Sequence, residues 1–529
     1  MEGFTGWDWM VVGGYLLLTT LIGHALRGRQ ATVKDFFLGG RSLPWQAVSG
    51  SIIATEISAL TFIGVPGTVF ALKGDFTYLQ WGIGSIMARF IVGYYLVPIY
   101  YQREIFSPYD FMGSRLGETV KKLVTVLFSL GSILGQSVRV LVTAIILKAV
   151  TGMDMWACIV VIGVFALLWT LMGGMRTVIW TDVIQFVVFI FGGILAFGWL
   201  TSSLGWTTIV EINSAVETTD GTIDKMRWFN GTSPFEDPLL GYTIWVAIFA
   251  MPFQNVAAFG TDQLNAQRIF CCKDAGDARK AIIWSSCSQI ITLLMLLVGA
   301  GLYAWYNQTA PTESEAALFE QDSNFVFPVW IVTVLPAGIK GLIIAGAFAA
   351  AVSSLDSILA ALSQTSLSMM FGKEKLLDVE EAPRMVRLSR ILVIIWAVLL
   401  VAAALLLSLN YNQGGDRDLI GLAFRMVAYV YGPLLGILVL AIAPWPKSTA
   451  GIVTGAALSI LVAAWALPDL YNLLTAFGWM DEETVQNLRP KIHFAWFYPI
   501  NAVITVACGV LGGVLGGKSG SELRSSVAQ

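Results

Sequence analysis

The chain has 529 residues, of which 56% are hydrophobic and 13% charged, and its formal net charge at pH 7 is −3. A mean hydropathy of +0.72 excludes an ordinary soluble domain. Two histidines, and five cysteines without metal-ligand spacing, argue against a metal centre, and no nucleophile–base pair indicates an enzyme. We therefore expect an all-α polytopic membrane protein.

Apolar windows recur along the whole chain. Each is about 20 residues long, which suits a helix rising about 1.5 Å per residue through a hydrocarbon core of about 30 Å. The sequence predicts about thirteen transmembrane helices, and we see no separate soluble domain. The predicted spans are approximately 7–26, 44–71, 78–101, 124–150, 155–173, 177–202, 241–267, 282–306, 336–371, 389–409, 419–444, 449–469 and 494–516.

The distribution of basic residues predicts the orientation. Lys and Arg collect in one set of alternate loops, for example Arg27, Lys34 and Lys121, while the other set is nearly bare. Because basic residues accumulate on the cytoplasmic side, we expect the N-terminus outside and the C-terminus inside. The acidic residues Glu2 and Asp8 precede the first span, so we do not expect a cleavable signal peptide.

Two spans are interrupted by polar residues, glycine and proline. The second contains SGSIIATEISALTFIGVPG (49–67), and the seventh contains MPFQNVAAFGTDQLNAQR (251–268). Non-helical backbone at membrane depth is tolerated where it is buried in protein or lines a cavity. The breaks lie five spans apart, as expected for a five-plus-five inverted repeat with a binding site between the repeats. The alternative is two kinks without a function.

The ninth span carries AFAAAVSSLDS (347–357) in an otherwise apolar stretch. Ser353 lies one helical turn from Asp356 and Ser357, so hydroxyls and a carboxylate share one face. Hydroxyls together with backbone carbonyls of an unwound neighbouring helix suit sodium, which prefers oxygen ligands. The alternative is a small-residue packing face whose serines bond to carbonyls one turn back.

Other ionisable residues in the spans indicate a pathway through the bundle. They are Glu56, Arg89, Arg139, Asp182 and Arg425. For Arg89 and Arg425 we favour ion pairing inside the protein or snorkelling. For Asp182, a helix cap is the alternative to a functional role.

These segments resemble the sodium/solute symporter family over nearly the whole chain. The matching stretches are DFFLGGRSLPWQAVSGSIIAT, GGMRTVIWTDVIQ, TDQLNAQR, AAVSS and YGPLLGILVLAIAPWPKSTAGIVTG. The resemblance implies a LeuT-like core. An N-terminal helix and loop (1–43) would precede a first repeat (44–203), an extracellular loop (204–240), a second repeat (241–444), and two C-terminal helices with a short tail (445–529).

The resemblance also implies ion sites. The family's main sodium site falls on the carbonyls of Ala54 and Ile57 and on Ala350, Ser353 and Ser354. Its role in this chain would be to bind the coupling ion.

A second sodium site of some members would use Asp182, Ser353, Asp356 and Ser357. The position of Asp356 commonly carries a hydroxyl in the family. Its carboxylate could strengthen sodium binding, bind a proton instead, or pair with a nearby arginine. The resemblance therefore implies one or two sodium ions.

For the solute, Arg139 is similar to the arginine with which sialic acid transporters hold a carboxylate, and a guanidinium can bind that group bidentately. Glu56 is the alternative partner for Arg139. Ala258 stands where galactose transporters place a gating tyrosine, which weakens the analogy to sugar transporters. The remaining positions that members use for sugars or sialic acid are Ser58, Thr61, Phe76, Gln80, Asn255 and Phe259.

We therefore expect a sodium-coupled symporter of the plasma (inner) membrane that imports a small organic solute by alternating access. The favoured solute is a carboxylated sugar such as sialic acid, or another organic anion. The alternatives are a sodium/neutral sugar symporter, a proton-coupled symporter and a non-transporting sensor. The expected partners are sodium, the solute and membrane lipid, with no nucleic acid and no obligate protein partner.

Overall fold

A computed structural model describes residues 4–26, 38–102, 105, 107–171, 175–218, 221–377, 381–412, 418–476, 478–480 and 489–516. Arg27 and Lys34, which contribute to the predicted orientation, lie outside these ranges. Within them, the regular structure is helical apart from a hairpin of β1 (Val216–Thr218) and β2 (Gly221–Ile223), paired antiparallel. The expected all-α class is correct for this part of the chain.

Ten unbroken helical stretches in the described residues are long and apolar enough to cross a membrane. They are α1 (Gly6–Leu26), η3–α5–η4–α6 (Thr77–Tyr101), α8 (Glu118–Thr151), α10 (Met175–Leu204), α15–η5–α16 (Ala275–Gln308), α19 (Ile339–Leu377), α20 (Ala382–Asn412), α21 (Leu419–Ile442), α22 (Thr449–Ala466) and η7–α25 (Phe494–Leu515).

Shorter helices complete the chain. The apolar α9 (Met155–Thr170) lies within the predicted span 155–173 and is only 16 residues long. The others are η1 (Gly39–Arg41), α7 (Pro108–Leu116), α11 (Trp206–Ser214), α17 (Glu313–Gln321), η6 (Ser323–Phe325), α18 (Val326–Val334) and α23 (Pro468–Ala476).

Two further spans are broken, and both lie where the sequence predicts a break. In the first, α3 (Trp45–Glu56) meets η2 (Leu60–Gly64) and α4 (Val65–Phe70) at a bend of 59°. In the second, α12 (Ile244–Phe249) and α13 (Met251–Gly260) meet α14 (Gln263–Ile269) at a bend of 61°. With each bent pair counted as one span, the described residues contain up to twelve candidate spans.

The breaks have local causes. Ile57 leaves the helix with φ −80° and ψ 113°, which ends α3 and frees its last carbonyls from the helical ladder. At the second break, the side chain of Asp262 accepts a hydrogen bond from the backbone N–H of Leu264 and caps α14.

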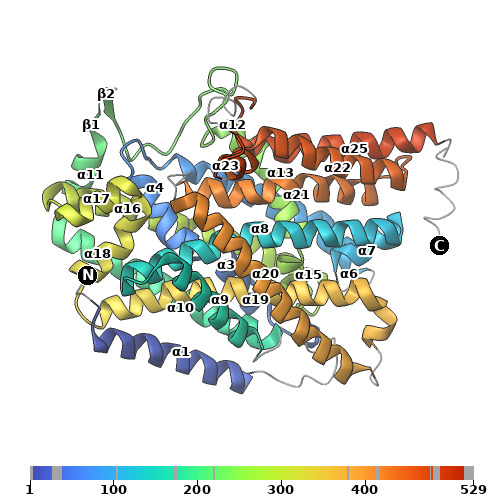
Figure 1. The fold of residues 1–529 in the computed structure, drawn as a ribbon, viewed down its shortest axis with the longest axis horizontal. Helices are drawn as coiled ribbons and strands as arrows, with labels where there is room; N and C mark the ends of the chain where they lie inside the picture. Colours follow the sequence, from blue (N-terminus) through green and yellow to red (C-terminus); the bar gives the residue numbers. More distant parts are fainter. Residues whose placement is uncertain are drawn as a thin grey trace.

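The helices differ greatly in burial. Of the most apolar 18-residue window of α19, 94% is buried, against 22% for α1 and 28% for α20. Helix α19 packs against α1, α3, α8, α10 and α20. Figure 1 shows α1 along one side of the molecule and the pair α22 and α25 along the opposite side. The helices outside the expected core thus flank it, and the polar stretch of α19 lies inside it.

Large apolar side chains cover the outer helices. On α20, Ile391, Ile394 and Val398 are 46%, 44% and 62% exposed. Exposed apolar area of this extent suits contact with lipid rather than water.

Candidate functional site

A cavity of about 180 Å³, here called the central cavity, lies between the two broken helices. Its walls come from both breaks and from α5, α8, α16 and α21. The polar and charged residues that line it are Thr55, Glu56, Thr61, Tyr78, Ser85, Gln136, Arg139, Gln254, Asn255, Asp262, Asn265, Ser288, Gln289, Thr292 and Tyr431.

The carbonyl oxygen of Thr55, at the end of α3, contacts side chains from two other helices. Arg139 on α8 donates from Nη1 to this oxygen at 3.0 Å. From α19, the hydroxyl of Ser354 lies 3.4 Å from the same oxygen and 3.3 Å from the carbonyl oxygen of Ala350. The structure therefore brings Ser354 against the break that contains Ala54 and Ile57, which are both buried, and Ala350 lies one turn before Ser354 on α19.

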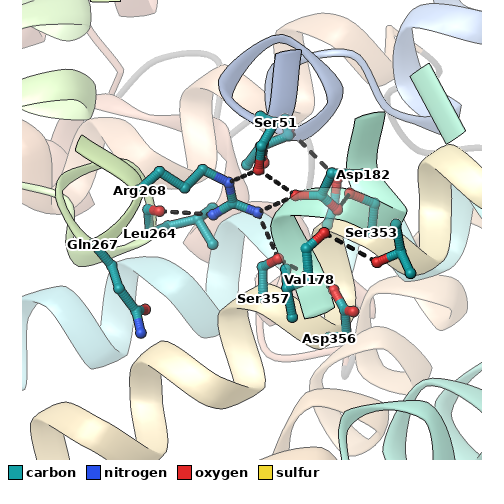
Figure 2. A network of polar contacts seen from close by, with 12 residues as sticks. Ser51, Val178, Asp182, Leu264, Gln267, Arg268, Ser353, Asp356 and Ser357 are labelled. Carbon is teal, nitrogen blue, oxygen red and sulfur yellow. Dashed lines mark hydrogen bonds and ion pairs between the residues drawn. The ribbon is translucent and has the colours of Figure 1, made fainter. Parts of the chain in front are cut away.

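Ser353 points away from this break, toward α10. Its hydroxyl donates to Asp182, which also accepts from Ser51 at 2.5 Å and forms an ion pair with Arg268 at 3.0 Å. Figure 2 shows these side chains converging from α3, α10, α14 and α19. Asp182 lies inside α10, so the helix-cap interpretation is wrong.

Arg268 is the centre of this network. Its guanidinium donates to Ser51 at 2.8 Å, to Ser357 at 2.6 Å and to the carbonyl of Leu264 at 2.8 Å. Like the Asp182 side chain, it is fully buried. The sequence pattern does not reveal this role, because Arg268 lies just beyond the predicted span 241–267 and resembles a basic residue of the following loop.

Asp356 lies next to the Arg268 network. Its carboxylate accepts a hydrogen bond from the Ser357 hydroxyl at 3.1 Å, and the residue is 2% exposed. In the described part of the chain, Arg268 forms its ion pair with Asp182 and not with Asp356. The predicted second-site residues Asp182, Ser353, Asp356 and Ser357 are thus neighbours, with a guanidinium among them.

Two other predicted buried arginines are ion-paired. The fully buried Arg89 pairs with Glu56, and its guanidinium also lies 4.4 Å from the ring centroid of Phe259. Arg425 pairs with Asp469 at 2.8 Å. Glu56 therefore neutralises Arg89 rather than Arg139, the partner considered from the sequence.

The predicted solute residues fall into two groups. Thr61, Arg139, Asn255 and Phe259 line the central cavity, as does Glu56.

Ser58, Phe76 and Gln80 do not line the central cavity, although all three are buried. The carboxamide of Gln80 is bonded to the carbonyl of Tyr242 at 3.1 Å and to the N–H of Asn230 at 3.3 Å. These bonds link Gln80 to backbone groups of the segment that precedes α12, and α12 itself packs against α5.

Asp262 also lines the cavity. The sequence shows it in the second broken segment but does not predict a place for it in the site. It accepts a hydrogen bond from the Tyr431 hydroxyl at 2.6 Å. Within the described residues, Arg139 has no carboxylate within ion-pair distance. The guanidinium of Arg139 therefore faces the cavity with donors available to a ligand.

A family model described as "SSF: Sodium:solute symporter family" matches residues 36–462. The chain belongs to this family. The symporter is 27% identical to the sodium/sialic acid symporter SiaT of Proteus mirabilis over 456 residues, which is 86% of this chain and 88% of that protein. It is 26% identical to sodium-coupled monocarboxylate transporter 1 of Mus musculus, over 87% of this chain and 73% of that protein.

The fold of the symporter also has a solved counterpart. The structure titled "Substrate-bound outward-open state of a Na+-coupled sialic acid symporter reveals a novel Na+-site" matches with a TM-score of 0.77 at 24% identity, covering 97% of this chain and 98% of that one. The architecture is therefore that of the LeuT-like sodium symporters. Family and fold identify a multi-pass membrane transporter, not an enzyme, that couples sodium to a small organic solute.

Proposed function

We propose that this symporter imports an organic anion whose carboxylate binds Arg139. The observation that carries the proposal is the half-buried guanidinium of Arg139, which lines the central cavity and has no ion-pair partner among the described residues. A guanidinium binds a carboxylate through two parallel hydrogen bonds, and low surrounding polarity strengthens them. The names of the Proteus and mouse relatives, which both refer to acids, support this solute class. A carboxylated sugar such as sialic acid is our favoured solute.

We propose that the coupling sodium binds at the break of α3. Its oxygen ligands would be the carbonyls of Ala54 and Ile57 together with Ala350, Ser353 and Ser354. The contact of Ser354 with both the α3 break and the Ala350 carbonyl supports this site, because sodium prefers a shell of such oxygens. Ser353 would have to turn from Asp182 to join it.

For the second site, formed by Asp182, Ser353, Asp356 and Ser357, we propose competition between a sodium ion and Arg268. The guanidinium already supplies a positive charge to Asp182 and a donor to Ser357. One sodium would be coupled while Arg268 holds this position, and a second could bind only after Arg268 withdraws. Asp356 would then complete the ion's ligands.

In the proposed transport cycle, sodium joins the α3 break to α19 and so stabilises the conformation that accepts solute. A ligand shifts a conformational equilibrium only by its differential affinity for the two states.

We further propose thirteen crossings of the plasma membrane with the N-terminus outside, and the repeat boundaries given above. The two bends of similar size, 59° and 61°, support the repeat.

Uptake into proteoliposomes tests the proposal. With an inward sodium gradient, Arg139→Ala should reduce uptake of N-acetylneuraminate by at least about 100-fold, because the bidentate bonds are lost, and Arg139→Lys should retain a small part of it. The sodium-dependent rise in melting temperature should persist in both variants and serves as the folding control.

Other outcomes would contradict the proposal. Unchanged uptake in Arg139→Ala would remove the carboxylate site. Sodium-driven uptake of glucose, but of no acid, would favour a neutral-sugar symporter. Uptake that survives without sodium but collapses when a proton gradient is dissipated would overturn the assignment of the coupling ion.

A further inference from the structure

Two carboxamide side chains of the central cavity, Gln136 and Gln254, lack protein partners in the described part of the chain. Both line the cavity, and they are only 8% and 6% exposed. Their carbonyl oxygens are buried without a hydrogen bond. Because buried polar groups are nearly always satisfied, two such side chains in the lining of one cavity indicate a ligand that supplies the missing bonds.

The other carboxamides around the cavity are already engaged, which sets these two apart. Gln289 donates to the Ser288 hydroxyl at 3.3 Å, and Asn255 donates to the Met251 carbonyl at 2.9 Å. Asn265 donates to the carbonyl of Ala258 at 2.9 Å.

Gln136 is placed to contact the same ligand as Arg139. The two residues are three positions apart on α8, so they share one face and are offset by about 4.5 Å along the helix axis. Gln254 belongs to α13, on the broken helix that forms another wall. A solute with its carboxylate on Arg139 would therefore present the atoms beyond that carboxylate to the two carboxamides.

The chemistry of a carboxamide selects the groups that it would bind. It accepts through oxygen and donates through nitrogen, which matches a hydroxyl group, itself both donor and acceptor. An unsubstituted acid would cover both carboxamides and leave them without hydrogen-bond partners, and sites built for hydroxyls discriminate strongly against ligands that lack them.

We propose that Gln136 and Gln254 bind hydroxyl groups of the solute and so select polyhydroxylated acids over unsubstituted monocarboxylates. This inference rests on the proposed anion site at Arg139 and names the residues that set its specificity.

Isothermal titration of the purified full chain in sodium buffer tests the inference with three probes of similar length. Gluconate carries a carboxylate and hydroxyls, hexanoate a carboxylate only, and glucitol hydroxyls only. The variants are Gln136→Met and Gln254→Met, which keep the side-chain length but remove the hydrogen bonds. Gln289→Met is the matched control, because it lines the same cavity with its carboxamide already bonded.

We expect the wild type to bind gluconate at least about 10-fold more tightly than hexanoate, and each of the two variants to lose about 10-fold or more of its affinity for gluconate. Affinity for hexanoate should change less than about 2-fold, and Gln289→Met should keep the wild-type ratio. Equal losses for gluconate and hexanoate, unchanged affinity for gluconate, or no preference for gluconate in the wild type would each overturn the inference.

The same titration separates failure of the anion site from failure of this inference. If the anion site is correct, Arg139→Ala weakens gluconate and hexanoate but not glucitol. If Arg139→Ala changes nothing while Gln254→Met weakens gluconate and glucitol alike, the anion site fails and the hydroxyl-binding role of Gln254 stands.

Discussion

At the scale of single residues, the hydroxyl of Ser354 is held only loosely by the protein. Its oxygen lies 3.4 Å and 3.3 Å from two carbonyl oxygens, whereas a hydroxyl normally approaches an acceptor to about 2.7–2.8 Å. In the proposed sodium site, a cation that lies between these three oxygens would draw them together.

Ser354→Ala should weaken sodium binding at least about 10-fold, because one ligand of a small shell is lost. The concentration of sodium that gives half-maximal thermal stabilisation measures this change. Ser354→Thr, which keeps the hydroxyl, should behave like the wild type. Sodium dependence that is the same in Ser354→Ala and the wild type would remove Ser354 from the site.

Arg268 and Asp182 form a buried ion pair in which each charge compensates the other. Arg268→Gln should destabilise the protein by about 3–5 kcal/mol, because it leaves the Asp182 carboxylate buried without a compensating charge. The double variant Arg268→Gln with Asp182→Asn should recover much of this loss in a thermal unfolding assay. Competition with sodium at this site predicts that high sodium stabilises the single variant more than the double variant.

Additive destabilisation by the two substitutions would show that the pair is not coupled. Equal stabilisation of both variants by sodium would instead show that no ion replaces the guanidinium there.

At the scale of helices, the sequence predicts the two broken spans well, because polar residues, glycine and proline together in an apolar stretch are rare in helices that only face lipid. It predicts partners across helices poorly. Glu56 pairs with Arg89, 33 residues along the chain, although Arg139 is equally suitable from the sequence. Helical periodicity fixes which face a residue occupies but not which charge on another helix it meets.

Arg268 shows how a boundary error hides the central residue of a buried polar network. The sequence predicts a seventh span that ends at about residue 267, yet α14 runs to Ile269 and buries Arg268 completely. The resemblance assigns Gln80 to the solute site, and the carboxamide of Gln80 is bonded to backbone groups, so its contact with a solute stays a prediction. The sequence does not predict that Gln136 and Gln254 line the cavity, because it shows only that they are polar residues in apolar spans.

At the scale of the whole molecule, His493 joins the loop that precedes α12 to the start of the last helix. Its backbone N–H donates to the carbonyl of Pro238 at 2.8 Å, and its Nδ1 accepts from the N–H of Ala495 at 3.3 Å. Burial, with a smaller contribution from the positive charge of Arg425, lowers the pKa of His493 from 6.5 to about 4. The folded protein therefore holds this histidine neutral at pH 7.

The stability of the symporter should fall as pH decreases from about 6.5 toward 4. In that range the unfolded chain protonates His493 and the folded chain does not, so protons favour unfolding. The melting temperature at pH 7.5 and at pH 5.5 measures the effect. His493→Asn cannot take up this proton and should show a smaller difference between the two values, whereas an undiminished difference would assign the pH dependence to other groups.

The carbonyl oxygen of Thr55 can couple the affinity for sodium to the affinity for the solute. Arg139 and Ser354 both reach this one atom, from α8 and from α19. When a carboxylate draws the guanidinium of Arg139 toward itself, a positive charge moves away from the proposed sodium site beside this oxygen, so sodium should bind at that site more tightly. Linkage requires the converse to the same degree: sodium that binds there must raise the affinity for the anion by the same factor, without any conformational relay between distant parts of the protein.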